Sequence, residues 1–486
     1  MSSYKSKVFS LSIGKFAHGL ITVAIAMIFS RILSKVDLST YRQTLLAYNF
    51  FTPILTLGIP ATIFYFLPQE KKRERGVILD NITILFILGI IFTIFLFFGG
   101  TELLAARFNN PNLLKTLKWL IFYPLYTFPA LGLTFVLIVY NKTKLVAVYE
   151  ILSNLVMAVL ILSAVVLTAS YEHPLIIKIA FPLFTLPVLL YLVFTTVKKG
   201  FDFPRIKEMK KAVEYGVPFG LSSIIAALSL QLDKVIVSSM CNPEEFAVYS
   251  NGAMEVPVVG IITGSIATVI ISDMRRHCAE NDYASALRIF RKSASVSAMV
   301  LLPVMCFLLV FSEGFIEFMF SSKYIESIIP FRVYLFTLPI RIAHYGSAFL
   351  ALGLKKEVLW KTAGNFIFNA VMSVILVYYI GSIGAAISTV LSLYLWSVPV
   401  NLKILSRSFK TSPWQVLPFR EIFHIFSVSL VAVFFTLPVK FINLSNVLQF
   451  FVGGVLFVIV YSAMAYRFFP DASKFVKQFL KGYIFR

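Results

Sequence analysis

Charged residues are scarce in this chain of 486 residues: they make up 14% of it, whereas an average soluble domain has about 25%. Apolar residues reach 58%, and the mean hydropathy is +0.85. Apolar stretches of about 20 residues, each able to cross a bilayer as a helix, recur along the whole chain. Such runs exclude an outer-membrane barrel, whose strands alternate with period two. The composition predicts an all-α, polytopic membrane protein.

Cysteine is also rare, and one nucleotide-binding motif is missing. The three cysteines, Cys241, Cys278 and Cys306, lack the spacing of a disulfide framework or a metal site. No G-x-x-x-x-G-K-[ST] loop occurs, because Gly14 and Lys15 are followed by phenylalanine. ATP-driven transport by this chain alone is therefore excluded, and we expect no cofactor.

The apolar stretches predict about fourteen membrane-spanning helices joined by short loops. We place them near residues 9–34, 40–66, 77–98, 114–140, 145–169, 174–197, 213–239, 247–271, 290–311, 328–352, 358–379, 382–404, 421–438 and 447–468. Prolines inside several of these spans predict bent or broken helices. They are Pro53, Pro60, Pro124, Pro129, Pro182, Pro187, Pro218, Pro257 and Pro339.

Weak internal repetition indicates two lobes of six helices each. Residues 30–33 close the first span as residues 233–236 close the seventh, and residues 58–62 correspond in depth to residues 264–268. Six helices followed by six in the same orientation form parallel repeats about an axis along the membrane normal. We therefore expect an N-lobe (1–200), a C-lobe (201–406), and a final part with two more helices and a cytoplasmic amphipathic tail (407–486).

Lysine and arginine gather in alternate loops and set the expected orientation. The loops at 170–173, 240–246 and 380–382 contain neither residue. By the positive-inside rule the basic loops are cytoplasmic, which places both termini in the cytoplasm. The net charge of +21 is scattered over these loops, so it indicates attraction to anionic lipids and no nucleic-acid binding. The basic loops lie at residues 71–75, 142–144, 198–211, 275–292, 355–361 and 403–420.

Some charged side chains and histidines lie within the spans, where a charge near the bilayer centre costs about 2.5 to 3.5 kcal/mol. Such residues usually face a cavity or a charged partner. The acids Asp233 and Glu255 are candidates for pairing with Lys234 or Lys178, or for coupling transport to protons or sodium ions. The candidates for binding an anionic substrate are Lys15, His18, Arg31, Lys178, Lys234, Arg341 and His344.

Most of these candidates also have a structural interpretation. Lys15, Arg31 and Lys178 lie near span ends, from which a long side chain can extend to the headgroups. Asp233 and Lys234 can cap the seventh span or form an ion pair between the lobes. Both histidines can be satisfied interior residues.

Arg341 is harder to explain structurally, because it lies near the middle of the tenth span. His344 follows it by three residues, which predicts that both face the same side of that helix.

Three short segments resemble a known family: YGVPF at 215–219, LDKVIV at 232–237 and EEFAVYS at 244–250. They are similar to polysaccharide-biosynthesis flippases of the O-antigen type, which belong to the multidrug/oligosaccharidyl-lipid/polysaccharide exporter superfamily. The resemblance implies a multi-pass protein of the bacterial inner membrane. It also implies that the protein moves an undecaprenyl-diphosphate-linked oligosaccharide from the cytoplasmic to the outer leaflet by alternating access, for surface polysaccharide such as lipopolysaccharide. The implied partners are membrane lipids, a polysaccharide polymerase and a chain-length regulator, and the implied state is a monomer.

The basic candidates suit this substrate on chemical grounds as well. A lipid diphosphate carries about two negative charges, and arginine and lysine bind its oxygens well. Two other functions remain open. A cation-coupled multidrug antiporter of the same superfamily favours an acidic interior, yet the first span has no Asp or Glu. A membrane polysaccharide polymerase or glycosyltransferase usually needs a larger outer loop than this chain has.

Overall fold

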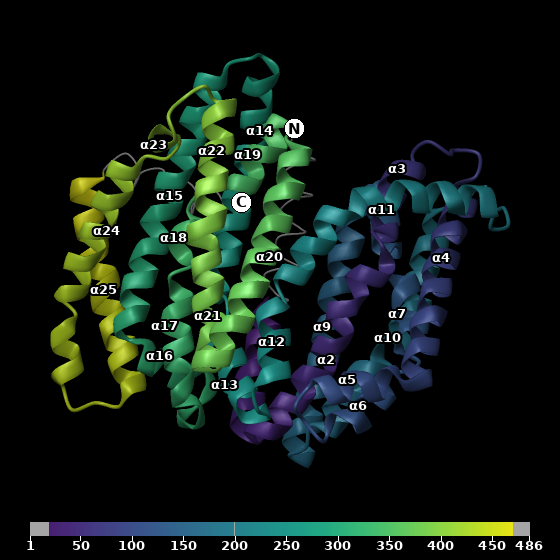
Figure 1. Ribbon diagram of the computed structural model, residues 1–486, viewed down its shortest axis with the longest axis horizontal. Coiled ribbons are helices and arrows are strands. Elements are labelled where there is room, and N and C mark those ends of the chain that lie inside the picture. The colour runs from purple at the N-terminus through teal and green to yellow at the C-terminus, as the bar shows by residue number, and fades with distance from the viewer. Residues whose placement is uncertain (1–18, 199, 470–486) are drawn as a thin grey trace. The chain divides into compact units, whose positions relative to one another are not determined.

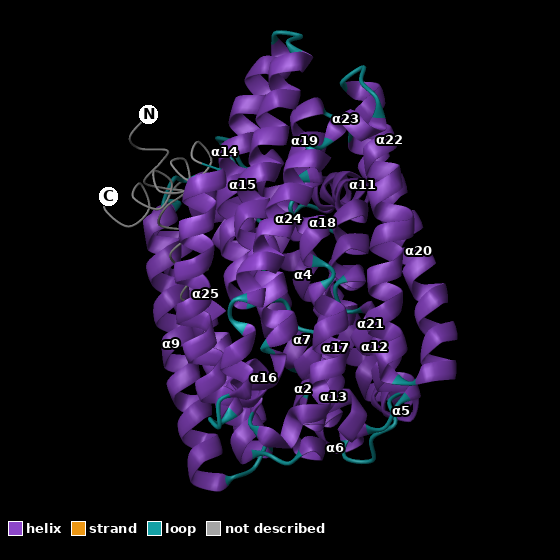
Figure 2. Cartoon of the chain, turned by 90° about the vertical axis from the view of Figure 1, so that its left-hand side faces the viewer, coloured by secondary structure: helices purple, strands orange, loops and turns teal. Residues whose placement is uncertain are grey.

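The computed structural model describes residues 19–198 and 200–469. Regular structure in these residues is entirely helical, and loops connect the helices (Figure 2). The contacts divide the chain into two compact units, Met1–Ala247 and Val248–Arg486. In Figure 1 unit 1 runs from purple to teal, and unit 2 runs from teal to yellow. The predicted repeat boundaries at residues 200 and 406 stay a prediction.

Unit 1 begins with a helix at Gly19–Ile32. Its further elements are α2 (Lys35–Thr56), η1 (Ile59–Thr62), α3 (Ile63–Phe66), α4 (Glu74–Phe95), η2 (Leu96–Gly100), α5 (Thr101–Arg107), α6 (Leu113–Trp119), α7 (Tyr123–Ala130), α8 (Leu133–Val139), α9 (Thr143–Thr168), α10 (Glu172–Thr196), α11 (Ile206–Ser229) and α12 (Leu232–Met240). The helix α13 (Pro243–Gly252) contains the boundary between the units.

Unit 2 continues with the following elements. They are α14 (Pro257–Ala279), α15 (Tyr283–Val310), α16 (Ser312–Phe320), η3 (Ser322–Ser327), α17 (Ile328–Leu335), α18 (Leu338–Arg341), α19 (Tyr345–Leu352), α20 (Lys355–Ile380), α21 (Ser382–Leu391), η4 (Ser392–Ser397), α22 (Val398–Ser408), α23 (Pro413–Val416), α24 (Phe419–Phe434), η5 (Leu437–Phe441) and α25 (Asn446–Phe468).

The described part of the chain confirms a multi-pass, all-helical membrane protein. Nine of its helices are long and apolar enough to cross a membrane, and twelve spans result if each bent pair is one span. Helices such as α9, α10 and α25 bury little of their apolar surface, as lipid-facing helices do. The predicted total of fourteen spans stays a prediction.

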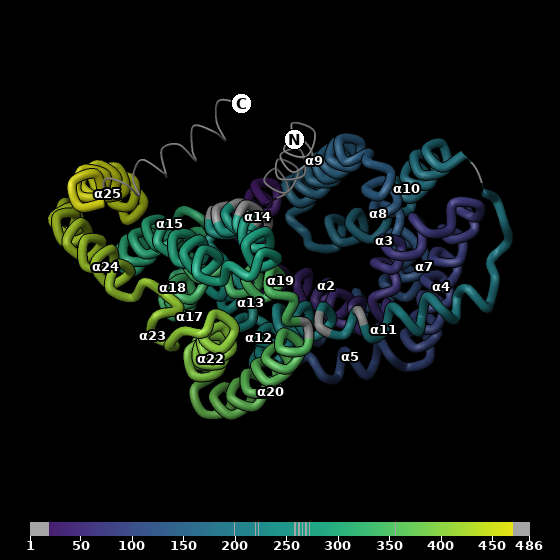
Figure 3. Tube along the Cα trace, turned by 90° about the horizontal axis from the view of Figure 1, so that it is seen from above, coloured from purple at the N-terminus to yellow at the C-terminus, as the bar shows by residue number. Residues whose placement is uncertain are grey.

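Each unit has its own apolar core. In unit 1, side chains of α3, α4, α8, α9 and α10 pack together, with Leu133, Val136 and Val193 almost fully buried. In unit 2, α15 is the central helix and contacts α14, α17, α18, α24 and α25. Small residues of α15, among them Ala294, Ser297 and Ala298, let its neighbours approach closely. Figure 3 shows α24 and α25 at the edge of this unit.

Several spans are broken, as the prolines predict. The chain bends by 46° between α2 and η1, where Leu57 and Gly58 both adopt positive φ. Pro60 opens η1 directly after this bend. Pro182 and Pro187 contradict the expectation, because α10 runs through both without interruption. Membrane helices tolerate such prolines where neighbouring groups satisfy the freed carbonyls.

The glycine at the first break also serves a close helix crossing. An added Cβ on Gly58 would lie 2.7 Å from the Gly216 oxygen and 2.7 Å from the Gly220 Cα. The backbone of α11 therefore crosses the α2–η1 break in direct contact, which only glycine permits on both sides. Helix α11 is itself bent by 54° between its segments 206–218 and 223–229.

Candidate functional site

Arg341 lies at an interruption of a membrane-spanning segment in unit 2. It ends the short helix α18, residues 342–344 are not helical, and α19 begins at Tyr345. The apolar segment as a whole covers Ser322–Leu352. Unwound backbone within a span is tolerated where it is buried in protein or lines a cavity. The structure thus places Arg341 next to a break in its span, as Pro339 in the same span predicted.

The partner of Arg341 comes from a second break in the same unit. Glu255 lies in the non-helical residues 253–256 between α13 and α14, and Arg341 Nη1 donates a hydrogen bond to Glu255 Oε1. The two side chains remain 35% and 42% exposed. Since a guanidinium carries five N–H donors, it can hold Glu255 and still contact another oxygen-rich group.

His344 does not share the environment of Arg341. It is buried, and its Nε2 lies 2.8 Å from the Ser297 hydroxyl of α15. The prediction that Arg341 and His344 face the same side of one helix is wrong. The helix ends at Arg341, so a spacing of three residues no longer sets the direction of the His344 side chain. His344 is held as an interior histidine next to the break.

Asp233 and Lys234 lie at a helix start and not at a helix end. The expected span 213–239 is interrupted near Gln231, and α12 begins at Leu232. Asp233 is 4% exposed, accepts a hydrogen bond from the backbone N–H of Lys234 at 2.8 Å, and lies 3.6 Å from its Nζ. A carboxylate in the first turn is stabilised by the N-terminal end of the helix dipole. This geometry supports the local capping interpretation of the pair.

The remaining candidates lie on separate helices of unit 1. Lys178 is half-buried in α10, with its Nζ 3.3 Å from the sulfur of Met157. Arg31 is exposed, and its Nη1 donates to the carbonyl oxygen of Met27 at 2.8 Å. Neither contact decides between a substrate contact and a headgroup contact. The two remaining candidates, Lys15 and His18, lie outside the described residues, so substrate binding by these basic residues stays a prediction.

Two basic residues that the sequence analysis assigned to loops lie inside the folded units. Arg73 is buried in unit 1, and Lys361 is half-buried in unit 2. For Lys361 a signal existed, because polar residues repeat at every fourth position of α20. For Arg73, Asp80 lies only seven residues further along the chain, but Asp202 and Phe203 come from more than 120 residues away, which no local pattern reveals.

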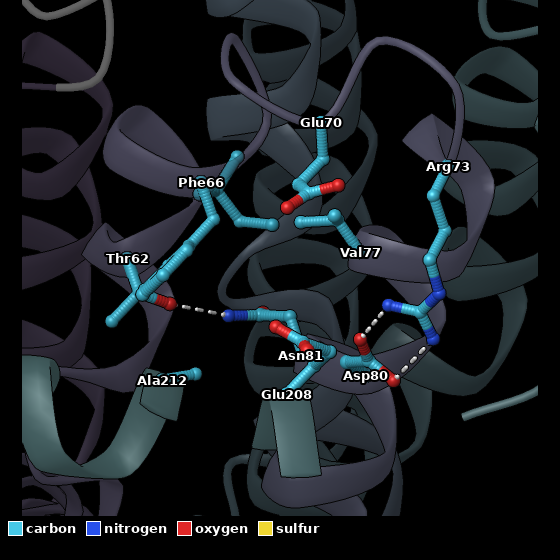
Figure 4. A pocket seen from close by; sticks show the side chains of 10 residues that line it. Thr62, Phe66, Glu70, Arg73, Val77, Asp80, Asn81, Glu208 and Ala212 are labelled. Atoms are coloured by element: carbon cyan, nitrogen blue, oxygen red, sulfur yellow. Dashed lines mark hydrogen bonds and ion pairs between the residues drawn. The ribbon is translucent and has the colours of Figure 1, made fainter. Parts of the chain in front are cut away.

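Arg73 borders a pocket of about 350 Å³, open mouth included, between α3, α4 and α11 (Figure 4). Its guanidinium donates to both oxygens of Asp80, at 2.5 and 3.2 Å, to Asp202 at 2.6 Å and to the Phe203 carbonyl at 2.9 Å. The hydrogen bonds to Asp80 raise the pKa of Arg73, and the bond from Arg73 lowers the pKa of Asp202. The only basic side chain among the described pocket residues is thus fully engaged.

The pocket is accordingly a poor site for an anionic substrate. Its other charged lining residues are the acids Glu70, Asp80 and Glu208. The Arg73 cluster instead ties the linker between α10 and α11 to the start of α4, where Gly76 N–H also donates to the Gly200 carbonyl. The charge pair at the two breaks of unit 2 remains the strongest candidate site.

Comparisons with known proteins agree with this architecture. The chain aligns with the structure of the lipid II flippase MurJ in an inward closed conformation, with a TM-score of 0.74 and 15% identity over 96% of this chain and 99% of that one. It aligns with an inward-facing multidrug resistance MATE family transporter of the MOP superfamily, with a TM-score of 0.63 and 16% identity over 84% and 99%. A MOP superfamily transporter from Pyrococcus furiosus gives 0.59 and 14% over 84% and 97%.

The sequence comparisons decide the family. No curated protein sequence matches the chain. Residues 5–271, more than half of the chain, match the family described as polysaccharide biosynthesis protein. The chain therefore belongs to the polysaccharide biosynthesis protein family, with the fold of the MOP superfamily transporters.

Proposed function

We propose that this protein translocates an undecaprenyl-diphosphate-linked oligosaccharide from the cytoplasmic to the outer leaflet of the bacterial inner membrane, for surface polysaccharide synthesis. The observation that carries the proposal is Arg341, a partly exposed cation at a break in a span, held by one carboxylate from a second break. A lipid diphosphate is the membrane substrate that best matches such a cation, since its oxygens bind a guanidinium in fork geometry. The family and the fold shared with a lipid II flippase support a lipid-linked substrate.

Glu255 gives the site a built-in competitor for the substrate. A diphosphate with about two charges attracts Arg341 more strongly than one carboxylate, so its arrival displaces Glu255 from the guanidinium. Arg341 and Glu255 each belong to a helix break, so replacement of Glu255 by the substrate changes the contact between the two breaks. This links substrate binding to the rearrangement that alternating access requires.

The membrane potential can supply the driving force. Outward movement of one net negative charge from an inside-negative cytoplasm gains about 2.3 kcal/mol per 100 mV. Glu255 is also the acid best placed in the described part of unit 2 to take up a proton or a sodium ion when Arg341 changes partner. Coupling to either ion belongs to the proposal.

The test is complementation of a flippase-deficient strain that carries the matching glycan pathway. At equal membrane expression, Arg341→Gln should reduce surface glycan about 10- to 100-fold, because charge-assisted hydrogen bonds contribute roughly 1.5 to 3 kcal/mol. Lipid-linked units should accumulate in the inner leaflet. Arg407→Gln, at an exposed arginine in the last turn of α22, is the matched control and should export normally.

A double variant separates binding from architecture. Arg341→Gln combined with Glu255→Gln removes both charges and leaves two amides that can hydrogen-bond each other. Export should stay low if Arg341 binds the diphosphate. Recovery of export in the double variant would show that the pair is structural. Drug resistance without glycan export by the unaltered protein would instead favour the antiporter.

A further inference from the structure

Helix α20 carries a polar face inside an otherwise apolar span. Its members recur at every fourth position, so they lie on one side of the helix. This side packs against α21, η4 and α22, while Trp360, Ile367 and Val371 on other sides are exposed as lipid-facing residues are. The polar face consists of Lys361, Asn365, Asn369 and Ser373. Within the face, Ser373 donates to Asn369 at 3.1 Å and contacts Ser388 of α21.

Lys361 is the basic member of this face, and the two groups that contact its ammonium in the described residues are neutral. Its Nζ donates to Asn401 Oδ1 at 3.0 Å and lies 4.2 Å from the centroid of the Phe349 ring. Phe349 is fully buried and Asn401 is 2% exposed. Asn401 Nδ2 donates to Ser397 in η4 at 3.3 Å, which directs the amide oxygen of Asn401 toward the ammonium.

The positive charge of Lys361 has no counter-ion in the part of unit 2 that the structure describes. Three other cations of unit 2 are paired: Arg341 with Glu255, and Arg332 and Lys440 with Glu313. No ion pair of Lys361 occurs among the described residues. An ammonium has three N–H donors, of which Asn401 uses one, so an interior cation remains with unused donors.

The same face of α20 carries a further polar group without a hydrogen-bond partner. Asn365, one turn further along α20, has a buried Oδ1 without a hydrogen-bond partner. The segment opposite, η4, is π-helical, and such distortions are frequent at functional sites. A cation without an ion pair among the described residues therefore lies next to a distorted span and one turn from an unsatisfied amide oxygen.

The position of Lys361 along the span relates it to Arg341. Phe349 follows Arg341 by eight residues in the same interrupted apolar segment, Ser322–Leu352, and Lys361 contacts Phe349. The end of α20 that carries Lys361 begins with Lys355 and Lys356, which the positive-inside rule assigns to the cytoplasmic side. Lys361 thus lies between the expected cytoplasmic mouth and Arg341.

We propose that Lys361, held by Asn401 and Phe349, forms a second anion subsite that takes the phosphate group of the substrate before Arg341 does. This proposal rests on the proposed function and extends it to a two-step path within unit 2. A lysine suits a transit position, because its ammonium binds phosphate as a point charge without the bidentate geometry of arginine. The ligand class is a phosphate or diphosphate group on an amphipathic molecule.

The experiment measures binding of farnesyl diphosphate to the full-length protein in phosphatidylcholine nanodiscs. Lys361→Gln should weaken binding about tenfold, and Lys361→Arg should retain most of it. Asn401→Asp is the decisive variant: the new carboxylate pairs with Lys361 and preserves the packing, so the melting temperature should hold while binding falls about tenfold. Lys356→Gln, at an exposed lysine of the same helix, should bind like the unaltered protein.

The outcomes separate this subsite from the proposed function. If Lys361→Gln and Asn401→Asp bind the probe normally while Arg341→Gln does not, the subsite is refuted and the function stands. If the unaltered protein does not bind the probe, both fail. Inorganic diphosphate should bind with the same dependence on Lys361, which would show phosphate recognition. Competition by phosphatidylglycerol in the nanodisc would assign Lys361 to bilayer lipids and overturn its place on the substrate path.

Discussion

At the scale of single residues, the fate of each charge in this protein depends on its partner. Arg73, Arg341 and Lys361 are all interior cations, yet they have three different environments. Every nitrogen of the Arg73 guanidinium donates to one of two carboxylates or to a carbonyl. Arg341 donates to one carboxylate, and within the described residues Lys361 contacts an amide and an aromatic ring. A saturated cation stabilises structure, whereas a cation with unused donors can bind a ligand.

The saturated cation gives a prediction about stability. Arg73→Gln should lower the free energy of unfolding by about 1 to 3 kcal/mol, because Asp80, only 6% exposed, loses its charged partner. Thermal unfolding in detergent is the measurement. Arg205→Gln is the control, since that arginine is 60% exposed in its pair with Asp202 and should change stability little. Equal effects of both variants would refute the anchoring role of Arg73.

The same cluster has a defined pH dependence. The bond from Arg73 holds the pKa of Asp202 below its ordinary value of 3.8. A depressed folded-state pKa contributes stability that is fully present above the unfolded value and is lost as the pH falls through the folded value. The stability difference between the unaltered protein and Asp202→Asn should therefore be constant from pH 7 to about 5 and shrink below pH 4. A difference that grows on acidification would contradict this assignment.

At the scale of elements, breaks in the helices matter more than their lengths. Three breaks place backbone contacts or charges at positions that a continuous helix would not offer. They are the α2–η1 break, the non-helical residues before α14 and the interruption after Arg341. The first break also determines how α11 packs, through the contact of Gly58 with Gly220. A crossing at backbone distance lets two bent helices pack closely, which suits elements that must move during transport.

This crossing predicts opposite outcomes for two glycine substitutions. Gly220→Ala gains helix propensity of about 1 kcal/mol, but its Cβ would meet the Gly58 Cα at 2.7 Å. Because backbone cannot move aside cheaply, we expect a lower melting temperature and reduced export. Gly346→Ala in α19 meets no atom within 4 Å and should be neutral or stabilising. Equal melting temperatures for both variants would show that α11 does not depend on this contact.

At the scale of the whole molecule, the distribution of basic loops predicts how the chain enters the membrane. A variant with its three cysteines replaced, carrying one new cysteine, tests the orientation. An impermeant maleimide should label Ser382→Cys in intact cells, because the loop at 380–382 lacks basic residues and is expected outside. Lys356→Cys should be labelled only after permeabilisation. The reverse pattern would invert the topology and the direction of the proposed transport.

The sequence by itself determined the class of this protein and the approximate position of most spans. Membrane spans depend on the length and apolar character of contiguous residues, because the bilayer must be crossed by about 20 apolar positions. Charge placement along the chain likewise predicted that Arg341 lies within a span. These properties are local, so one-dimensional patterns suffice. The prediction of one continuous span at 213–239 was wrong at one point, where a local break divides it into α11 and α12.

Only the tertiary structure decided which charges meet. Arg341 and Glu255 are 86 residues apart, and Arg73 and Asp202 are 129 residues apart, so no spacing rule relates them. The structure also separated His344 from Arg341 and gave Lys361 a place inside unit 2. The physical reason is that pairing depends on helix breaks and on packing between distant segments, which a chain acquires only when it folds.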